Sequence, residues 1–397
     1  MKLATRVKKI KPSPTLAVTM RAKALQAQGK DIIAFGVGEP DFDTPENIKQ
    51  AAIRAIQEGF TKYTPVGGID ELKDAIITKL KRDNDLTYRR SQIVVSCGAK
   101  HTLYNIAQAL FEKGDEVIVP SPYWVSYPDI FLLAGAKPVI VNTTASAGFK
   151  LTPEKLEKAI KKKTRAVVIN SPSNPTGATY NLRELEGLTE VILSKGILVI
   201  SDDIYEKILY DGLKFHNMAN VSEAMKDLCI VVNGVSKTYA MTGWRIGYAA
   251  GPESVISAVT EMQSQSTSNA TSISQKAAVE ALAGDQKTVS VMAAEFEKRR
   301  NYIVDQLNRI KGISCMKPQG AFYAFPRVSR LYGTGYRGRK IAHSVDLSEL
   351  LLEEAGVAVV PGSAFGNDRH IRISYATSMK NIEEGVRRIK AVVGKLT

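Results

Sequence analysis

Residues 230–247 read Ile-Val-Val-Asn-Gly-Val-Ser-Lys-Thr-Tyr-Ala-Met-Thr-Gly-Trp-Arg-Ile-Gly. The first four are typical of a strand buried on both faces of a sheet. Lys237 follows in a turn, and Arg245 comes eight residues later. A lysine beside buried strand ends loses hydration and lies near other cations, so its pKa falls below about 10.4. We therefore take Lys237 as a candidate for a Schiff base with a carbonyl compound, and Arg245 as a donor suited to phosphate.

The same order of short apolar strand, turn and amphipathic helix extends upstream of this stretch. It indicates an α/β fold with a mostly parallel central sheet and helices on both faces. Two helices are expected to begin at Thr44-Pro45-Glu46 and Thr152-Pro153-Glu154, each with Thr as N-cap. The predicted strands are 93–96, 116–119, 137–141, 166–170, 198–201, 230–233 and 247–250.

The pattern changes from about Met292 onward. A long charged helix leads to strands at 321–325, 357–360 and 370–374 and a helix at 346–355, which together predict a smaller α+β domain. The predicted divisions are an irregular N-terminal segment that packs with the small domain, a large ligand-binding domain, and the small C-terminal domain: 1–43, 44–291 and 292–397.

Side chains suited to one ligand follow several predicted strands, at the edge where such sheets bind ligands. Cys97-Gly98-Ala99-Lys100 places small residues before a helix N-terminus, which suits an anion but also suits a plain tight turn. Trp124 could stack on a flat heterocycle, or could be a core aromatic.

Two more strand ends carry polar groups. Asn174 lies in Ser-Pro-Ser-Asn-Pro-Thr-Gly, where its amide could donate to a ring oxygen or simply belong to a turn. Asp202 ends a buried strand, where a carboxylate is costly unless paired, and a pyridinium N–H would pair it. Tyr205 could share the ring oxygen with Asn174. Each signal alone is weak, but five strand ends with complementary parts form a strong signal together.

These residues lie in motifs that resemble the class I/II (fold type I) aminotransferases. The resemblance runs almost end to end and is closest to the bacterial aspartate aminotransferases, including those that also accept prephenate. The matching stretches are 38–45 (Gly-Glu-Pro-Asp-Phe-Asp-Thr-Pro), 62–65 (Lys-Tyr-Thr-Pro), 171–177, 201–205 (Ser-Asp-Asp-Ile-Tyr), 236–247 and 371–376 (Ile-Arg-Ile-Ser-Tyr-Ala).

The resemblance implies a pyridoxal 5'-phosphate (PLP) enzyme that transfers an amino group between an amino acid, L-aspartate above all, and a 2-oxo acid. Lys237 would hold the cofactor and be the catalytic residue, and Tyr63 would reach the phosphate of a neighbouring subunit in a homodimer. The other implied cofactor contacts are Gly98, Ala99, Lys100, Trp124, Asn174, Asp202, Tyr205, Ser236 and Arg245. The implied substrate contacts are Gly38, Trp124, Asn174 and Arg372, with Arg372 on the α-carboxylate.

Two positions depart from the family pattern. Gly234 stands where many aspartate aminotransferases have Ser, which puts one phosphate contact in doubt, and Ala99 replaces a frequent Gly. A dicarboxylic substrate needs a second cation. Lys11 is the candidate, because a lysine at this place accompanies prephenate use in the bacterial subgroup. A surface lysine is the alternative interpretation.

The composition of the chain argues against several other classes of protein. The 397 residues include 44% apolar and 24% charged side chains, and no apolar run is long enough to span a membrane. The net charge of +14 is spread among acids, so no nucleic-acid partner is expected. Three separated cysteines, no metal spacing and no apolar secretion signal predict a cytoplasmic protein without a metal, although a short transit peptide stays open.

Several other PLP-dependent functions fit these motifs. Fold type I lyases, such as C–S lyases or aminocyclopropane-carboxylate synthases, share the lysine and ring contacts, and an aminotransferase for aromatic amino acids or alanine is another alternative. A PLP-sensing DNA-binding regulator is not expected, because the pattern begins within the first forty residues. Residues 333–338 match GxGxxG, but no buried strand precedes them, and they are taken as a loop that could form a lid.

Overall fold

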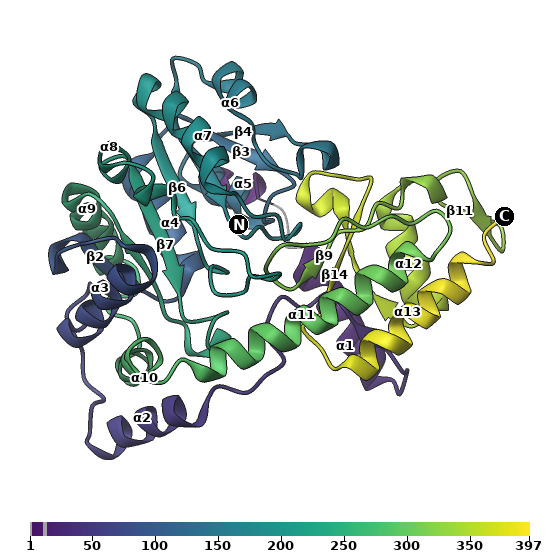
Figure 1. Ribbon diagram of the computed structural model, residues 1–397, viewed down its shortest axis with the longest axis horizontal. Helices are drawn as coiled ribbons and strands as arrows, with labels where there is room; N and C mark the ends of the chain where they lie inside the picture. The colour runs from purple at the N-terminus through teal and green to yellow at the C-terminus, as the bar shows by residue number, and fades with distance from the viewer. Residues whose placement is uncertain (1, 11–13) are drawn as a thin grey trace.

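A seven-stranded sheet lies at the centre of the larger part of the molecule (Figure 1). The computed structural model describes residues 2–10 and 14–397. The strand order is β2-β8-β7-β6-β5-β3-β4, and only β8 runs antiparallel to its neighbours. The predicted mostly parallel sheet is confirmed. Its strands are β2 (Ile93–Ser96), β3 (Glu116–Ser121), β4 (Lys137–Asn142), β5 (Thr164–Asn170), β6 (Leu198–Asp202), β7 (Cys229–Gly234) and β8 (Gly247–Ala250).

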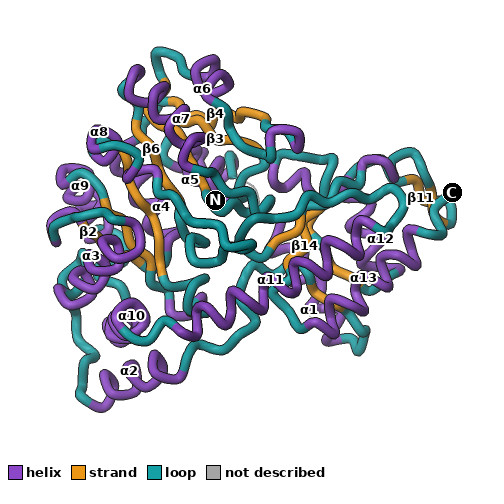
Figure 2. Tube along the Cα trace, in the orientation of Figure 1, coloured by secondary structure: helices purple, strands orange, loops and turns teal. Residues whose placement is uncertain are grey.

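Helices cover both faces of this sheet (Figure 2). Along β5, Val167 and Ile169 point into one hydrophobic cluster, while Ala166 and Val168 point into the other. This two-faced burial explains why the strands are continuously apolar. One face packs on α2 (Glu46–Gln57), α3 (Asp70–Asn84), α6 (Pro153–Ala159), α7 (Leu182–Lys195), α8 (Glu223–Lys226) and α10 (Ser272–Ala283). The other packs on α4 (Ala99–Leu110), α5 (Ser126–Leu133) and α9 (Glu253–Ser264).

The two predicted helix starts behave differently. Thr152 caps α6 as expected, since its hydroxyl accepts from the Lys155 N–H. α2 begins at Glu46, but the expected Thr44 cap is wrong. The Thr44 hydroxyl instead donates to the Ala240 carbonyl at 2.8 Å and accepts from the Trp244 indole N–H at 3.0 Å. Contacts far along the chain therefore take the hydroxyl that local sequence would have given to the cap.

The C-terminal part contains a three-stranded antiparallel sheet beside three helices. Part of the predicted strand at 321–325 is regular, and the predicted strand at 357–360 is divided into two. The sheet order is β13-β14-β9. The elements are α11 (Lys287–Asn308), β9 (Tyr323–Ala324), α12 (Ser344–Glu354), β12 (Val357–Ala358), β13 (Val360–Pro361), β14 (Ile371–Ser374) and α13 (Met379–Val393). The domain boundaries at 43/44 and 291/292 stay predictions, and α11 continues across the second.

The N-terminal segment is more regular than expected. Residues Pro14–Ala27 form helix α1, and β1 (Ile33–Ala34) pairs in parallel with β12. Within α1 only Ala22 is fully buried, against Ile32, Leu352 and Ala358. A helix that buries so little of its surface carries a weak apolar period, so the sequence pattern did not reveal it.

The GxGxxG stretch forms a short hairpin of β10 (Gly335–Tyr336) and β11 (Arg339–Lys340). Gly335 exchanges two backbone hydrogen bonds with Thr397, at 2.7 and 3.1 Å. In Figure 1 β11 lies beside the C-terminus, far from the carboxyl ends of the sheet strands. This position argues against a lid.

Two features are absent from the described residues. None of their helices has both the length and the apolar character needed to cross a membrane. Their His, Cys, Asp and Glu side chains form no group of three or more that could hold a metal ion.

Candidate active site

A cavity of about 450 Å³ lies at the carboxyl ends of β5, β6 and β7. The N-terminal segment, the ends of the central sheet and β14 all contribute to its walls. Most of the predicted site residues line it: Gly38, Ala99, Lys100, Trp124, Asn174, Asp202, Tyr205, Ser236, Lys237, Arg245 and Arg372.

Lys237 follows β7 and points its amine at the N-terminal segment. The Nζ atom donates to the Gly38 carbonyl oxygen at 2.6 Å. Burial lowers the pKa of Lys237 from 10.5 to about 8; the charge of Glu39 opposes this shift, whereas Arg245 and Arg372 favour it. A substantial share of this amine is therefore neutral near pH 8, as a nucleophile or base requires.

Asp202 is the last residue of β6 and is buried. Its Oδ2 accepts a 2.5 Å hydrogen bond from the Tyr127 hydroxyl, and its Oδ1 accepts from the Ile204 N–H at 3.3 Å. Burial raises the pKa of Asp202 to about 6, although the bonds from Tyr127 and Ile204 and the charge of Lys237 work against the rise. The site thus holds a carboxylate whose charge needs a cationic partner.

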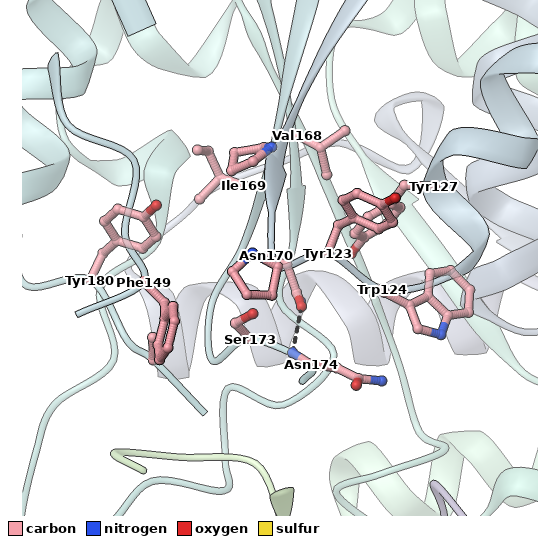
Figure 3. Close-up of a pocket in the computed structure, with 13 residues that line it drawn as sticks. Tyr123, Trp124, Tyr127, Phe149, Val168, Ile169, Asn170, Ser173, Asn174 and Tyr180 are labelled. Atoms are coloured by element: carbon pink, nitrogen blue, oxygen red, sulfur yellow. Dashed lines mark hydrogen bonds between the residues drawn. The ribbon is translucent and has the colours of Figure 1, made fainter. Parts of the chain in front are cut away.

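The ends of β5 and β6 are joined through Asn170. Its side-chain oxygen accepts from the Asn174 backbone N–H at 2.9 Å, and its Nδ2 donates to the Asp202 carbonyl at 2.8 Å. Figure 3 shows the bond to Asn174 as a dashed line, with Trp124 beside it. One carboxamide therefore sets the positions of two predicted ligand contacts.

Arg372 reaches the same cavity from β14 and is buried. Its Nη1 donates to Asn174 Oδ1 at 3.1 Å and its Nη2 to the Gly36 carbonyl at 2.7 Å. The guanidinium lies over the rings of Tyr323 and Phe365, at 4.6 and 5.0 Å from their centroids. Its Nε is buried and has no hydrogen-bond partner among the described residues.

Tyr205 meets an unexpected neighbour from the C-terminal part. Its hydroxyl lies 2.8 Å from that of Tyr323, and the two rings meet edge to face. Burial raises the pKa of Tyr205 well above 10, with the neighbouring Tyr323 as the next cause. Tyr205 therefore stays protonated and can donate to an oxygen in the cavity.

The other end of the cavity lies at the N-terminus of α4. Gly98 takes the N-cap position with φ of 90°, and a Cβ atom there would lie 2.3 Å from Arg245 Nη2. Arg245 is held by the carbonyls of Thr242 and Cys97, at 2.8 and 3.2 Å. Burial, assisted by Arg245, lowers the pKa of Lys100. The free N–H groups of a helix N-terminus and two cations make this end suitable for a phosphate.

The Gly234 departure has a structural reason. A Cβ atom on Gly234 would lie 2.8 Å from the Ile246 carbonyl oxygen and 3.0 Å from Gly247 Cα. A serine here would require β7 and β8 to separate. The absence of a hydroxyl at this position therefore follows from the close approach of the two strands.

Comparisons with known proteins bear on this site. The family described as "Aminotransferase class I and II" matches residues 30–389. The chain belongs to this family. It is 52% identical to the probable aspartate/prephenate aminotransferase of Rickettsia bellii over 396 residues, which cover 99% of both chains.

Solved structures agree with this family assignment. The aspartate aminotransferase from Rhizobium meliloti is 47% identical, with a TM-score of 0.97 and 100% of both chains covered. The aspartate aminotransferase from Thermus thermophilus with maleate is 41% identical, with a TM-score of 0.93, covering 99% of this chain and 100% of the other. The fold predicted from the sequence is thus confirmed.

Aminotransferases of class I and II use PLP, and the residues of this chain fit that cofactor. The cavity volume lies in the range of about 300–1,000 Å³ typical of small-molecule sites. Asp202 is a buried carboxylate that no salt bridge joins to a described Lys or Arg, which suits a pyridinium N–H. Glycine at position 98 leaves Arg245 the space it needs beside the helix N-terminus. The chain of this aminotransferase therefore offers partners for the ring nitrogen and for the phosphate.

Two of the predicted site residues that the structure describes, Gly98 and Tyr63, do not line this cavity. Gly98 lies just behind its wall, against Arg245. Tyr63 lies in the loop between α2 and α3, and 92% of its surface is exposed in the single chain. Lys11 lies outside the described residues.

Sequence reasoning missed Tyr127, Asn170 and Tyr323, all of which line the cavity. Tyr127 comes three residues after Trp124 in the first turn of α5, and Asn170 ends β5, so the strand-end rule could have found both. Tyr323 comes from β9, far along the chain. No local pattern in the sequence connects it with this site.

Proposed function

We propose that this aminotransferase exchanges the amino group of L-aspartate with a 2-oxo acid, 2-oxoglutarate or prephenate, in a ping-pong reaction. The observation that carries the proposal is the pairing of Lys237 and Arg372 in one cavity, where an amine with a lowered pKa and a buried guanidinium line the same space. The choice of aspartate as substrate rests on the names of the Rickettsia bellii and Rhizobium meliloti relatives, and the choice of prephenate rests on the former.

Each part of PLP has a proposed partner. Lys237 would hold it covalently, Asp202 would pair with the ring nitrogen, and Asn174 and Tyr205 would donate to the ring oxygen. Trp124 would lie against the ring. The phosphate would be held by Ala99, Lys100, Ser236 and Arg245, which line the cavity, and by the backbone at Gly98 next to them. When bound, PLP supplies an electron sink for the charge that develops at the substrate Cα.

Lys237 and Asp202 supply the proton chemistry in this proposal. The Lys237 amine, with its pKa lowered to about 8, would take the proton from the substrate Cα and deliver it to the C4′ atom of the cofactor, and in the second half of the reaction it would move a proton in the opposite direction. Asp202 keeps its negative charge toward the ring nitrogen and holds a proton on that atom. Tyr205, with its pKa raised by burial, keeps its proton and donates to the ring oxygen.

Arg372 positions the substrate. A guanidinium offers a planar fork of donors to a carboxylate, and the contacts with Asn174, Gly36 and Tyr323 hold this one in place. The bound α-carboxylate fixes the direction of the Cα–H bond, which speeds proton transfer through orientation. Gly38 and Trp124 line the rest of the substrate space.

Selection for a dicarboxylic substrate is assigned to Lys11. It precedes α1, whose Thr15, Leu16 and Thr19 line the cavity. A cation there would meet the second carboxylate of aspartate or prephenate.

A half-reaction with purified holoenzyme tests the proposed function. L-Aspartate alone should replace the absorbance band of lysine-bound PLP with that of pyridoxamine phosphate, and 2-oxoglutarate or prephenate should reverse the change. Conversion by an aromatic amino acid or alanine but not by aspartate would reassign the substrate. Release of pyruvate and ammonia without pyridoxamine phosphate would indicate a lyase.

The proposed assembly is a homodimer in which Tyr63 contacts the phosphate bound in the other subunit. Its high exposure in the single chain is what such a contact requires. Mixing Tyr63→Ala and Lys237→Ala chains tests this idea. If the site is shared, one of the two active sites in each mixed dimer contains both wild-type Lys237 and wild-type Tyr63. The activity of the mixture should then exceed the sum of the activities of the two variants. Strictly additive activity would contradict a shared site.

A cytoplasmic location is proposed from the three free cysteines. Cell fractionation with an antibody against the chain would test it. Recovery of the chain in a membrane or extracellular fraction would contradict it.

A further inference from the structure

Tyr127 makes the shortest polar contact to Asp202 that the site contains among the described residues, with 2.5 Å between the two oxygens. Both side chains are buried, at 2% and 4% exposure. This separation lies in the range of charge-assisted O–H···O⁻ bonds, which are stronger than neutral ones. Nothing in the sequence motifs or in the proposed roles uses this hydroxyl.

The direction of the bond is determined by the protonation of the phenol. Burial and the neighbouring Asp202 raise the pKa of Tyr127 well above 10, so the phenol keeps its proton and donates it. Asp202 accepts, with Oδ2 on Tyr127 and Oδ1 on the Ile204 N–H. Two donors thus fix the plane of the carboxylate and favour its charged form.

Tyr127 is held independently of Asp202. It lies in the first turn of α5, and its ring meets the ring of Trp124 edge to face at 5.3 Å. Residues 124–127 therefore place both an aromatic ring and a hydroxyl group at the cavity from one short segment. Figure 3 shows the side chains of Trp124 and Tyr127 projecting from this segment.

We propose that Tyr127 is a positioning residue that keeps Asp202 ionised and oriented toward the ring nitrogen of PLP. The inference rests on the proposed pairing of Asp202 with that nitrogen. It adds a residue that touches Asp202 and acts on the cofactor only through it.

The affinity of the apoenzyme for PLP, measured by equilibrium titration across pH 5–9, tests this role. Tyr127→Phe keeps the ring contact with Trp124 and removes only the hydroxyl. At pH 7 its Kd for PLP should rise about tenfold, the effect expected for losing a hydrogen bond to a charged group. The pH below which affinity falls should also move up by about one unit, because Asp202 would take a proton more readily.

The groups facing Asp202 make this pH shift interpretable. Lys237 and Tyr205 stay in place in every variant, as does Asp203, which follows Asp202 in the chain. Lys100 and Arg245, the proposed phosphate contacts, are also unchanged, so titration of the PLP phosphate should contribute equally to every variant. The difference between variants therefore reports the environment of Asp202.

Tyr180→Phe is the matched control. Tyr180 is a similarly buried tyrosine at 5% exposure, and its hydroxyl accepts from the Leu151 N–H at 2.7 Å. Its loss should reduce stability without changing the pH dependence of PLP binding. A Kd and a pH midpoint for Tyr127→Phe that match those of Tyr180→Phe would overturn the proposal.

A double-mutant cycle separates the role of Tyr127 from that of Asp202. Asp202→Asn alone tests whether Asp202 contributes to PLP binding at all. If Tyr127 acts through Asp202, adding Tyr127→Phe to Asp202→Asn should change the Kd by less than about twofold. A full tenfold loss in that background would overturn the proposed role of Tyr127 and leave the assignment of Asp202 intact.

Discussion

Arg372 on β14 donates from Nη1 to the Oδ1 atom of Asn174, which follows β5, at a distance of 3.1 Å. The two residues are 198 positions apart in the chain, and this bond joins the C-terminal sheet to the central sheet at the cavity. The proposed carboxylate contact and the proposed ring-oxygen contact are therefore mechanically coupled. A change at either residue is expected to affect both substrate and cofactor.

Arg372→Lys should raise the KM for amino acid and oxo acid by roughly 100-fold, because an ammonium cannot reproduce the planar fork of a guanidinium. Steady-state kinetics with both substrates would measure this change. Arg369→Lys, an exposed arginine on the preceding loop, is the matched control and should leave KM unchanged. Equal effects of the two substitutions on KM would show that Arg372 does not bind the substrate.

Lys237→Met should stabilise the apoenzyme at pH 7 by about 3 kcal/mol, because it removes a buried amine that binds its proton less tightly when folded. The folded pKa is about 8 and lies below the ordinary 10.5, so the wild-type chain regains this stability as pH rises from about 8 to 10.5. The difference should vanish over that range in urea unfolding. Lys340→Met, at an exposed lysine, is the control. A difference that stays constant with pH would contradict the assigned cause.

Asn170→Ala should weaken PLP binding and lower kcat about tenfold, because the ends of β5 and β6 lose their link. Unfolding in urea should show a loss of about 1–3 kcal/mol from the unpaired buried groups. Asn142→Ala, at the exposed end of the edge strand β4, is the control. Stability loss without any change in PLP affinity would limit Asn170 to a structural role.

Lys11→Ala should raise the KM for aspartate and prephenate far more than the KM for a monocarboxylic amino acid, by roughly tenfold or more, because only the former carry a second carboxylate. Lys9→Ala, two residues earlier at an exposed position, provides the comparison. Kinetics with both substrate classes give the result directly. Similar changes for both classes would exclude a role in specificity.

His370→Phe should reduce the loss of stability on acidification. His370 stacks on Phe325 at 4.8 Å, and burial together with Arg327 and Arg369 lowers its pKa to about 4. Because the folded pKa lies below the ordinary 6.5, the neutral ring stabilises the fold above pH 6.5, and this contribution is lost as pH falls toward 4. Between pH 7 and 5 the wild type should lose about 2 kcal/mol more than the variant in urea unfolding.

His216→Phe is the control for this measurement, since His216 lies in a loop and is only partly buried. Its dependence on pH should match that of the wild type. Parallel stability curves for wild type and His370→Phe would show that another group titrates.

Much of the fold was predictable because its signals are local. All seven strands of the central sheet were identified within two residues at each end, since burial on both faces requires continuous apolar runs. Helix α1 was missed because it buries only Ala22, and Thr44 was misassigned because a distant carbonyl and indole compete for its hydroxyl. Local propensity fails where tertiary contacts offer a better partner.

The sequence by itself determined the order of strands and helices, the side chains at each strand end and the family to which the chain belongs. Only the tertiary structure brought Tyr323 to Tyr205, aimed the Tyr127 hydroxyl at Asp202 and placed Arg372 against Asn174. The polar side chains that follow each strand can be identified from the local sequence, and they are expected to meet because parallel strands end at one edge of a sheet. The contacts of Tyr323 and Arg372 join side chains more than a hundred residues apart and depend on how two sheets pack, whereas the contact of Tyr127 depends on how α5 packs on the central sheet. No periodicity along the chain encodes either packing.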